Sequence, residues 1–213
     1  MYENIIAIPY RDRAAHLEYF IKNTVPLLQE HLPNSKVVVI EQNKGKLFNR
    51  AAVLNVAFKE YENKTKYFFT HDVDINPTKK CIEEYYIKEV NDNNVLGIYT
   101  SCCNTLGGII KIKESIIHKI NGFPNDVWGW GTEDKALQNR AEYYNIKKIT
   151  NLTNETEHPL YLLRFNDVND RETKHINSNT IKHYTHFHNL NKNEKMKEIM
   201  STGLNNLKYT ILE

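Results

Sequence analysis

The first half of the chain alternates between short apolar runs and longer segments with helical periodicity. Apolar runs at 5–8, 36–41 and 67–70 predict strands, and apolar residues at helical spacing within 16–32 and 48–60 predict helices between them. A strand-helix-strand-helix-strand order favours parallel strands joined by right-handed crossovers. We therefore expect an α/β fold with a Rossmann-like, doubly wound and mostly parallel sheet.

Two details of this half carry further expectations. The β-branched run 37–40 is typical of a strand that is buried on both faces of a parallel sheet. Pro26 lies inside the first helical segment, where it should bend or restart the helix.

The second half predicts fewer regular elements. Residues 151–193 are polar and rich in Asn and His, so we expect mostly irregular structure there. The chain contains neither internal repeats nor a Gly/Ser linker, and its 213 residues suit a single domain. The remaining elements expected are strands at 95–99 and 108–112 and helices at 114–120, 133–144 and 192–200.

Composition removes several classes of function. A formal net charge of +2 gives no field that would attract nucleic acid. No stretch of 18 apolar residues exists and no basic-then-apolar leader begins the chain, so we expect no membrane span and a cytoplasmic location. Cys81, Cys102 and Cys103 are an odd number of cysteines, which favours a reducing compartment.

Asp72-Val73-Asp74 directly follows the apolar run 67–70 and precedes Pro77. Residues two apart on an extended chain point the same way, so both carboxylates can face a crevice at the carboxyl edge of the sheet. Hard divalent cations such as Mn²⁺ or Mg²⁺ prefer such oxygen ligands. The pattern predicts a site for a metal-bound phosphate, and the alternative is a pair of carboxylates that only solvate a turn.

Basic residues occur where two other elements meet the same edge. Arg11 and Arg13 follow the first strand, and Arg50 opens the helix at 48–60. Guanidinium groups and the positive end of a helix both suit phosphate or a nucleobase edge. Each of these residues alone fits an ordinary surface charge equally well.

The segment 122–134 interleaves two Trp with Gly residues and ends in an acidic pair. Gly allows unusual backbone angles, and Trp128 and Trp130 offer flat faces on which a sugar ring can stack. Glu133 and Asp134 begin a helix, where the helix dipole alone would favour carboxylates. In a functional interpretation, one of them deprotonates an acceptor hydroxyl and the other holds a sugar.

Histidines gather late in the chain, mostly between His158 and His188. A neutral imidazole from this region can complete a metal site begun by Asp74, although each His taken singly is better explained as a surface residue. Since no Cys accompanies them, a structural zinc site is not expected. The sequence has no nucleophile elbow, P-loop or dinucleotide-binding Gly run, so hydrolase functions rank low.

Taken in order, these segments resemble the β-1,4-galactosyltransferase family, which are metal-dependent inverting enzymes of the GT-A fold. The resemblance spans nearly the whole chain and is most specific in the Asn-Gly-Phe-Pro-Asn and Trp-Gly-Trp-Gly-Thr-Glu-Asp stretches. The matching segments are 8–13, 48–51 with 54–56, 72–74, 107–108, 121–134 and 203–209.

The resemblance implies a role for each matching residue. It implies Asp134 as the catalytic base and Asp74 as a ligand of Mn²⁺, with Mg²⁺ as the alternative ion. Counting back from Gly203 favours His175 as the second ligand, with His186 and His188 as alternatives. The implied donor-binding residues are Arg11, Arg13, Arg50, Asp72, Gly108 and Trp130, and the implied acceptor-binding residues are Trp130, Glu133 and Asp134.

It also implies the reaction, which is transfer of Gal or GalNAc from a UDP-sugar to a sugar hydroxyl of a glycan or glycoconjugate, forming a β-linkage. Residues of about 1–100 would hold the nucleotide and about 101–213 the acceptor. Thr105 stands where the family often has an aromatic residue, and its smaller side chain leaves room for an N-acetyl group. Lys135 and Ala136 replace the further acidic residues that usually follow, which would alter acceptor contacts.

Three alternatives remain open. The first is a transferase that uses UDP-GlcNAc or UDP-Glc as the donor. The second is a catalytically silent relative that only binds glycans. A nucleotidyltransferase would use the Asp pair but leaves the Trp-Gly-Trp-Gly loop unexplained. Since the chain has no membrane anchor or stem like those of Golgi members, we expect a bacterial or viral relative that works in the cytosol.

Overall fold

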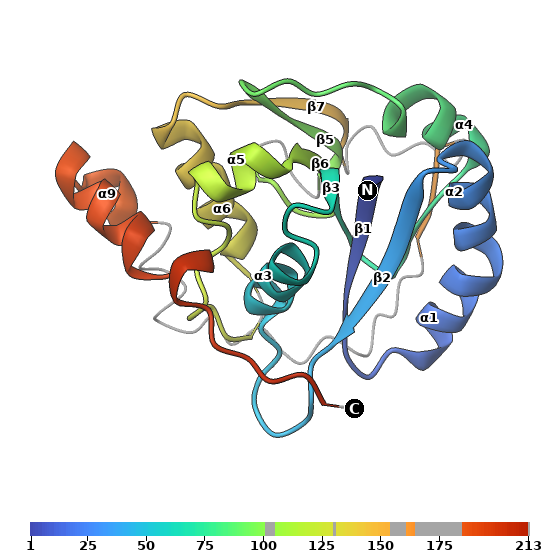
Figure 1. Cartoon of the computed structure of the whole chain (residues 1–213), viewed down its shortest axis with the longest axis horizontal. Helices are drawn as coiled ribbons and strands as arrows, with labels where there is room; N and C mark the ends of the chain where they lie inside the picture. The colour runs from blue at the N-terminus through green and yellow to red at the C-terminus, as the bar shows by residue number, and fades with distance from the viewer. Residues whose placement is uncertain (101–104, 130, 154–160, 165–184, 213) are drawn as a thin grey trace.

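A mixed sheet lies at the centre of the computed structural model, which describes residues 1–100, 105–129, 131–153, 161–164 and 185–212 (Figure 1). Within these residues the sheet has six strands in the order β2-β1-β3-β6-β5-β7. The strands are β1 (Tyr2–Tyr10), β2 (Ser35–Glu41), β3 (Thr65–His71), β5 (Asn94–Thr100), β6 (Ile109–Lys113) and β7 (Lys147–Thr153).

Most neighbouring strands run parallel, as the sequence predicted. Strand β1 pairs in parallel with both β2 and β3, and β5 pairs in parallel with β7. Strand β6 is antiparallel to both of its neighbours, β3 and β5. The start of β6 therefore lies at the same sheet edge as the carboxyl end of β3.

Helices cover both faces of the sheet, so the fold is doubly wound (Figure 1). One face carries α1 (Ala14–Tyr19), the π-helical η1 (Phe20–Thr24), α2 (Val25–His31), α4 (Lys79–Cys81) and η2 (Ile82–Tyr86). The other carries α3 (Arg50–Glu60), α5 (Glu114–Lys119) and α6 (Glu133–Tyr143), with α9 (Lys192–Ser201) outside them.

Alternation along the central strands divides the core into two layers. Ile5 and Ala7 of β1 pack with α3, α5 and α6, whereas Ile6 and Ile8 pack with η1, α2 and η2. All four are fully buried, because successive side chains of a strand point to opposite faces and both faces are covered.

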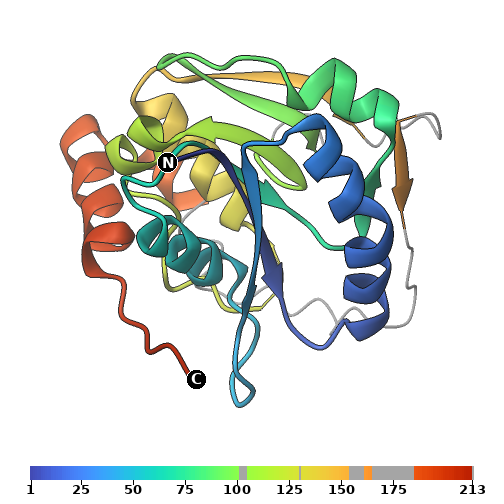
Figure 2. The ribbon, with the colours of Figure 1, turned by 45° about the vertical axis from the view of Figure 1, so that its right-hand side comes forward.

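The structure corrects one expectation, confirms another and adds three strands. Strand β2 is not buried on both faces: it is an edge strand, its Val39 is 38% exposed, and Val38 is its buried apolar residue. Pro26 lies in the first turn of α2, which begins at Val25 directly after the π-helical turn, so the expected restart of the helix is confirmed. Strand β7 and the small pair formed by β4 (Ile75–Pro77) with β8 (Leu162–Arg164) were not predicted (Figure 2).

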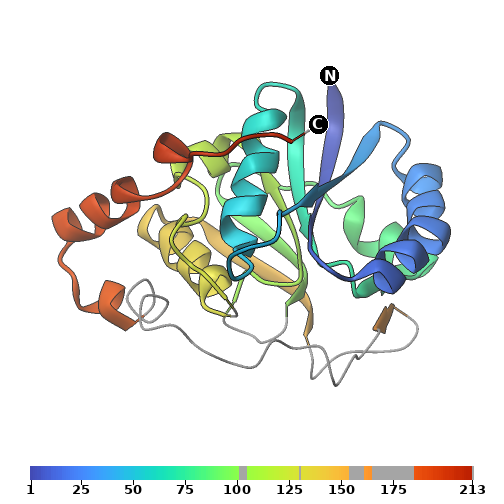
Figure 3. The same cartoon turned by 90° about the horizontal axis from the view of Figure 1, so that it is seen from below.

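The C-terminal residues close the α3 side of the molecule. After α8 (Phe187–Asn189) and α9, the short η4 (Leu204–Asn206) leads into a tail that runs along α3 (Figure 3). The Tyr209 hydroxyl donates to Oε1 of Glu60 at 2.5 Å, which fastens the tail to the end of α3. Among the described residues, none of the helices has the length and apolarity that crossing a membrane requires.

Candidate active site

Five segments from distant parts of the chain meet at one edge of the sheet. The carboxyl ends of β1 and β3 and the start of β6 lie at this edge, because His71 pairs with Ile109 in the antiparallel register. The amide of Asp72 donates to the carbonyl oxygen of Gly108 at 3.3 Å. The N-termini of α3 and α6 bring Arg50 and Glu133 to the same place.

Arg50 joins the Asp pair to the acidic pair of α6. Its Nε donates to Oδ1 of Asp72 at 2.9 Å, and its Nη2 lies 2.7 Å from the same oxygen. Its Nη1 lies 3.6 Å from Oε1 of Glu133. The helix that positions Arg50 is capped by Asn49, whose side chain accepts from the amide of Ala52 at 2.8 Å.

The charges of this group depend on one another. Burial alone would lower the pKa of Arg50, but Asp72 and Glu133 hold that pKa above its ordinary value, so the guanidinium stays charged. Burial and the neighbouring charge of Asp134 raise the pKa of Glu133 to about 7, against the opposing effect of Arg50. The site thus holds a carboxyl group that can change its charge near neutral pH.

Two polar atoms of this group lack hydrogen-bond partners. Among the residues that the structure describes, Oε2 of Glu133 is buried and forms no hydrogen bond, and Nη1 of Arg50 is buried and has only its 3.6 Å ion pair with Glu133. Buried polar atoms are normally satisfied, so such a group marks a place where a ligand or water binds. Donors on Arg50 and an acceptor on Glu133 together match a hydroxyl group, which both accepts and donates.

Asp134 faces the Gly pair at the start of β6. A Cβ atom at Gly107 would stand 2.5 Å from Oδ2 of Asp134, so only glycine leaves room for the carboxylate in this position. Oδ1 of Asp134 accepts from the amide of Lys135 at 2.7 Å, and the Asp134 carbonyl accepts from the amide of Leu106 at 3.4 Å. The buried Thr105 directly precedes this contact.

Arg11 and Arg13 make contacts of different kinds. Nη1 of Arg13 lies 3.4 Å from Oδ2 of Asp74, so this pair links the end of β1 to the Asp motif. Nη1 of Arg11 donates to the Lys46 carbonyl at 2.6 Å, and its guanidinium lies 5.4 Å from the centre of the Phe48 ring. Arg11 therefore contacts the β2–α3 loop, whereas Arg13 contacts the Asp motif.

The proposed metal ligands are only partly within the described residues. Asp74 is half-buried, whereas His175, like Trp130, lies outside the described residues. His186 and His188 are exposed near α8. In the described part of the chain, no three His, Cys, Asp or Glu side chains gather closely enough to hold a metal, so neither of these two His forms such a group with Asp72 and Asp74.

Asn side chains of the motifs form a scaffold that sequence reasoning missed. Nδ2 of Asn49 donates to the Asn125 carbonyl at 2.7 Å, and Nδ2 of Asn55 donates to the Phe123 carbonyl at 2.8 Å. Nδ2 of Asn125 donates in turn to the Gly203 carbonyl at 2.7 Å. Their presence inside the motifs 48–56, 121–134 and 203–209 was the available signal, because Asn often bridges backbone groups.

Arg140 locks the same scaffold from α6. It is buried, and its guanidinium donates to the carbonyls of Asn121 and Gly122 at 2.9 Å and of Thr202 at 2.6 Å. Burial lowers the pKa of Arg140 to about 10. Residues 121–125 and 202–206 are therefore structurally one unit, which supports the N-terminus of α3.

The doubly wound sheet gathers acidic and basic side chains at its carboxyl edge, which is where open α/β sheets bind their ligands. Residues 1–86 match the N-terminal region of glycosyl transferase group 7, and residues 92–189 match the N-terminal domain of galactosyltransferase. The chain belongs to the β-1,4-galactosyltransferase family.

Relatives and solved structures agree with this assignment. The chain is 36% identical to human β-1,4-galactosyltransferase 4 over 149 residues, which cover 67% of this chain and 43% of that protein. It is 30% identical to bovine β-1,4-galactosyltransferase 1 over 216 residues, covering 98% of this chain and 50% of that protein. The chain thus spans half or less of the length of these two relatives.

Among solved structures, the catalytic domain of Drosophila β1,4-galactosyltransferase 7 with xylobiose has the same fold. The TM-score is 0.79 at 22% identity, and the match covers 100% of this chain and 87% of that chain. A mutant of that enzyme, solved with manganese, UDP-Gal and xylobiose, matches equally well. The sequence-based expectation of a GT-A fold is confirmed.

Proposed function

We propose that this chain is an Mn²⁺-dependent inverting glycosyltransferase that moves Gal or GalNAc from a UDP-sugar to a sugar hydroxyl of a glycan or glycoconjugate. Membership of the family supports the reaction class. The manganese, UDP-Gal and xylobiose bound to a protein of the same fold support the kinds of ligand.

The observation that carries the proposal is the pair of buried polar atoms between the two motifs that form no hydrogen bond. Nη1 of Arg50 is a donor and Oε2 of Glu133 an acceptor, at the place where the Asp pair meets the acidic pair of α6. A sugar hydroxyl satisfies both kinds of atom at once, whereas a phosphate offers only acceptors to Glu133. The arrangement favours a sugar over a phosphate at this point.

Asp134 is the base in this proposal. Its carboxylate takes the proton of the acceptor hydroxyl while the acceptor oxygen forms a bond to the anomeric carbon of the donor. The bond from that carbon to the UDP oxygen breaks, and UDP leaves with the electron pair. A single displacement inverts the anomeric centre, so an α-linked donor yields a β-linked product.

On the donor side we propose Arg11, Arg13, Arg50, Asp72, Gly108 and Trp130, and on the acceptor side Trp130, Glu133 and Asp134. Asp74 and His175 would hold the metal, since carboxylate oxygen and neutral imidazole both suit Mn²⁺. The half-buried carboxylate of Asp74, two residues beyond Asp72, fits this role. When bound, the cation neutralises charge that develops on the leaving diphosphate.

The extent of the domain and the choice of donor belong to the same proposal. Residues 1–213 would act as one domain, with the nucleotide bound by about 1–100 and the acceptor by about 101–213. The buried Thr105 beside the Leu106–Asp134 contact leaves GalNAc as well as Gal open. UDP-GlcNAc and UDP-Glc are the donors against which this choice must be tested.

The deciding experiment measures UDP release from each of the four UDP-sugars with Mn²⁺, with and without simple sugar acceptors. We expect release from UDP-Gal or UDP-GalNAc that an acceptor stimulates. Asp134→Asn should still bind the donor and should lose transfer. If wild-type protein binds glycans but releases no UDP from any donor, the chain is a silent glycan-binding relative.

A further inference from the structure

His71 closes strand β3 immediately before the Asp motif. It is fully buried, and it follows Tyr67 and Phe69 on the face of the sheet that packs against η1 and η2. The Phe20 ring packs edge-on against the imidazole, with 5.1 Å between the ring centres. A polar ring in this apolar layer needs partners for both of its nitrogens.

The two partners of His71 determine its tautomer. Nδ1 lies 2.9 Å from the carbonyl oxygen of Asp72, and Nε2 lies 2.8 Å from the hydroxyl of Tyr86. Because a carbonyl oxygen can only accept, Nδ1 must carry the hydrogen. Nε2 of the neutral ring then accepts from Tyr86. Burial lowers the pKa of His71 to about 4, so the ring is neutral at neutral pH.

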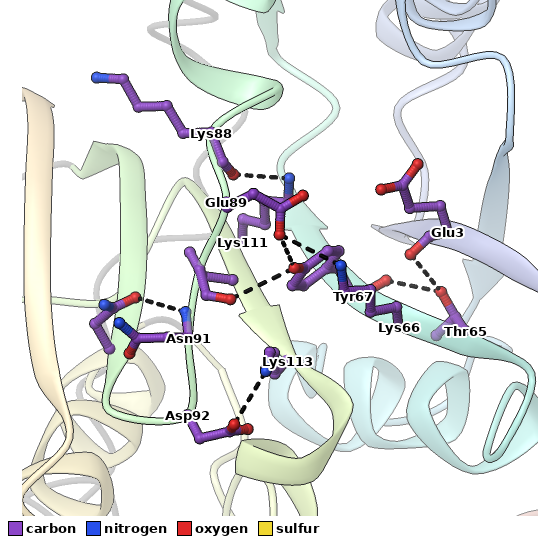
Figure 4. Close-up of polar contacts among 12 residues, drawn as sticks. Glu3, Thr65, Lys66, Tyr67, Lys88, Glu89, Asn91, Asp92, Lys111 and Lys113 are labelled. Atoms are coloured by element: carbon purple, nitrogen blue, oxygen red, sulfur yellow. Dashed lines mark hydrogen bonds and ion pairs between the residues drawn. The ribbon is translucent and has the colours of Figure 1, made fainter.

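Tyr86 is itself held firmly at the end of η2. It is fully buried, and its ring stacks on Phe69 with 5.3 Å between centres. The ammonium group of Lys111 donates to the carbonyl of Tyr86 and to that of Lys88, both at 2.9 Å, and Figure 4 shows the Lys88 carbonyl facing Lys111. The helix end that supplies the hydroxyl is thus fastened to β6.

The Asp72 carbonyl closes the turn that contains the Asp motif. It accepts from the amide of Ile75 at 3.3 Å as well as from His71. The bond to Ile75 spans three residues, as in a β-turn, with Val73 and Asp74 in the middle. A group that fixes this carbonyl therefore fixes the turn on which Asp74 sits.

We propose that His71 is a positioning residue for the Asp72–Asp74 turn, held in the Nδ1–H tautomer by the Asp72 carbonyl, with the hydroxyl of Tyr86 donating to Nε2. It touches neither donor nor acceptor and acts through the peptide carbonyl of Asp72. The proposed glycosyl transfer gives this role its functional meaning, since the turn carries the proposed metal ligand. The order of the turn itself can be measured without any ligand.

Hydrogen exchange of the Ile75 amide tests the inference directly. In His71→Asn the side-chain NH₂ group can donate in place of Nδ1–H. In His71→Leu the side chain is of similar size but has no hydrogen-bond donor. The amides of β1 serve as the internal reference. Relative to them, we expect the Ile75 amide of the Leu variant to exchange at least about tenfold faster than that of the wild type. The Asn variant should stay within about threefold of wild type. Unchanged exchange in the Leu variant, or equal acceleration in both, overturns the inference.

If the Leu variant does not fold, a second measurement tests the inference on the wild-type protein. Nitrogen NMR of the wild-type imidazole should show hydrogen on Nδ1, and Tyr86→Phe should keep the hydrogen on Nδ1 while shifting the Nε2 resonance, because Nε2 loses its hydrogen bond. Hydrogen on Nε2 in the wild type contradicts the assignment.

In activity assays, the Leu variant should need about tenfold more Mn²⁺ for half-maximal UDP release, with the Asn variant close to wild type. A wild type that releases no UDP refutes the proposed function, while the exchange data still decide the role of His71.

Discussion

Oδ2 of Asp134 lies where a side chain on Gly107 would be, 2.5 Å from an added Cβ atom. The glycine therefore fixes where the proposed base can stand. Gly107→Ala should push the carboxylate out of this position. Because catalysis depends on the geometry of the reacting groups, we expect transfer to fall by about a hundredfold while donor binding is kept.

Steady-state kinetics with varied donor and acceptor check this expectation. The matched control adds Gly107→Ala to Asp134→Asn. If the alanine acts through Asp134, the double variant should be no slower than Asp134→Asn alone. A further large loss in the double variant would mean that the alanine disturbs something other than the base.

Arg50 should matter both for stability and for transfer. Arg50→Met leaves the buried carboxyl group of Glu133 and the carboxylate of Asp72 without their cation, so the free energy of unfolding should fall by about 3 kcal/mol. Arg50→Lys keeps the charge but loses the fork of donors, so it should fold well and transfer more than tenfold more slowly. Urea denaturation with parallel rate measurements separates the two effects. A lysine variant with wild-type activity would remove Arg50 from the proposed site.

The lowered pKa of His71 predicts that the stability of the protein depends on pH. Its pKa is about 4 in the folded protein and 6.5 for an ordinary His, so the unfolded chain binds a proton more readily between these values. Stability is therefore fully present above pH 6.5 and is lost as the pH falls towards 4, by about 3 kcal/mol. Tyr86 and the Asp72 carbonyl face the ring, and the charge of Arg50 opposes its protonation.

Urea denaturation of wild type and His71→Asn between pH 4 and 7 measures this contribution. Glu133 acts in the opposite direction, because its raised pKa makes stability fall as the pH rises from 4.5 towards 7. Glu133 is present in both proteins, so the difference between their curves isolates His71. Parallel curves would show that the ring is not held neutral by burial.

Arg140 should stabilise the unit formed by residues 121–125 and 202–206. Arg140→Met leaves the carbonyls of Asn121, Gly122 and Thr202 without their buried donor. Each unsatisfied group costs about 1 kcal/mol or more, so we expect a loss of at least about 3 kcal/mol in urea denaturation. The control is Lys59→Met, which removes a partly exposed surface pair with Glu62 and should change stability by less than about 0.5 kcal/mol. Equal effects of the two variants would contradict the proposed clamp.

Removal of the metal should abolish activity reversibly. A chelator should stop UDP release, and Mn²⁺ should restore it. Asp74→Ala should raise the Mn²⁺ requirement strongly, because it deletes a proposed oxygen ligand. Arg13→Met removes the partner of Asp74 but not the ligand, so its Mn²⁺ requirement should change far less. Unaltered Mn²⁺ dependence in Asp74→Ala would exclude Asp74 as a ligand.

Local sequence pattern was sufficient for most of the fold. The apolar runs of β1 and β3 and the periodicity of α3 predicted their elements, because alternation and helical spacing are properties of neighbouring residues. The local sequence did not reveal that β2 lies at the edge of the sheet. Whether a β-branched strand lies inside a sheet or at its edge depends on which strand pairs beyond it, and nothing pairs on the outer side of β2 within the described sheet.

The sequence by itself determined the family, the doubly wound order of elements and the residue types that carry charge at the candidate site. Only the tertiary structure decided how these residues meet. Arg50 joins Asp72 to Glu133, Gly107 makes room for Asp134, and His71 reaches Tyr86. These contacts connect residues far apart along the chain, and their geometry depends on strand register and helix packing, which no single segment encodes.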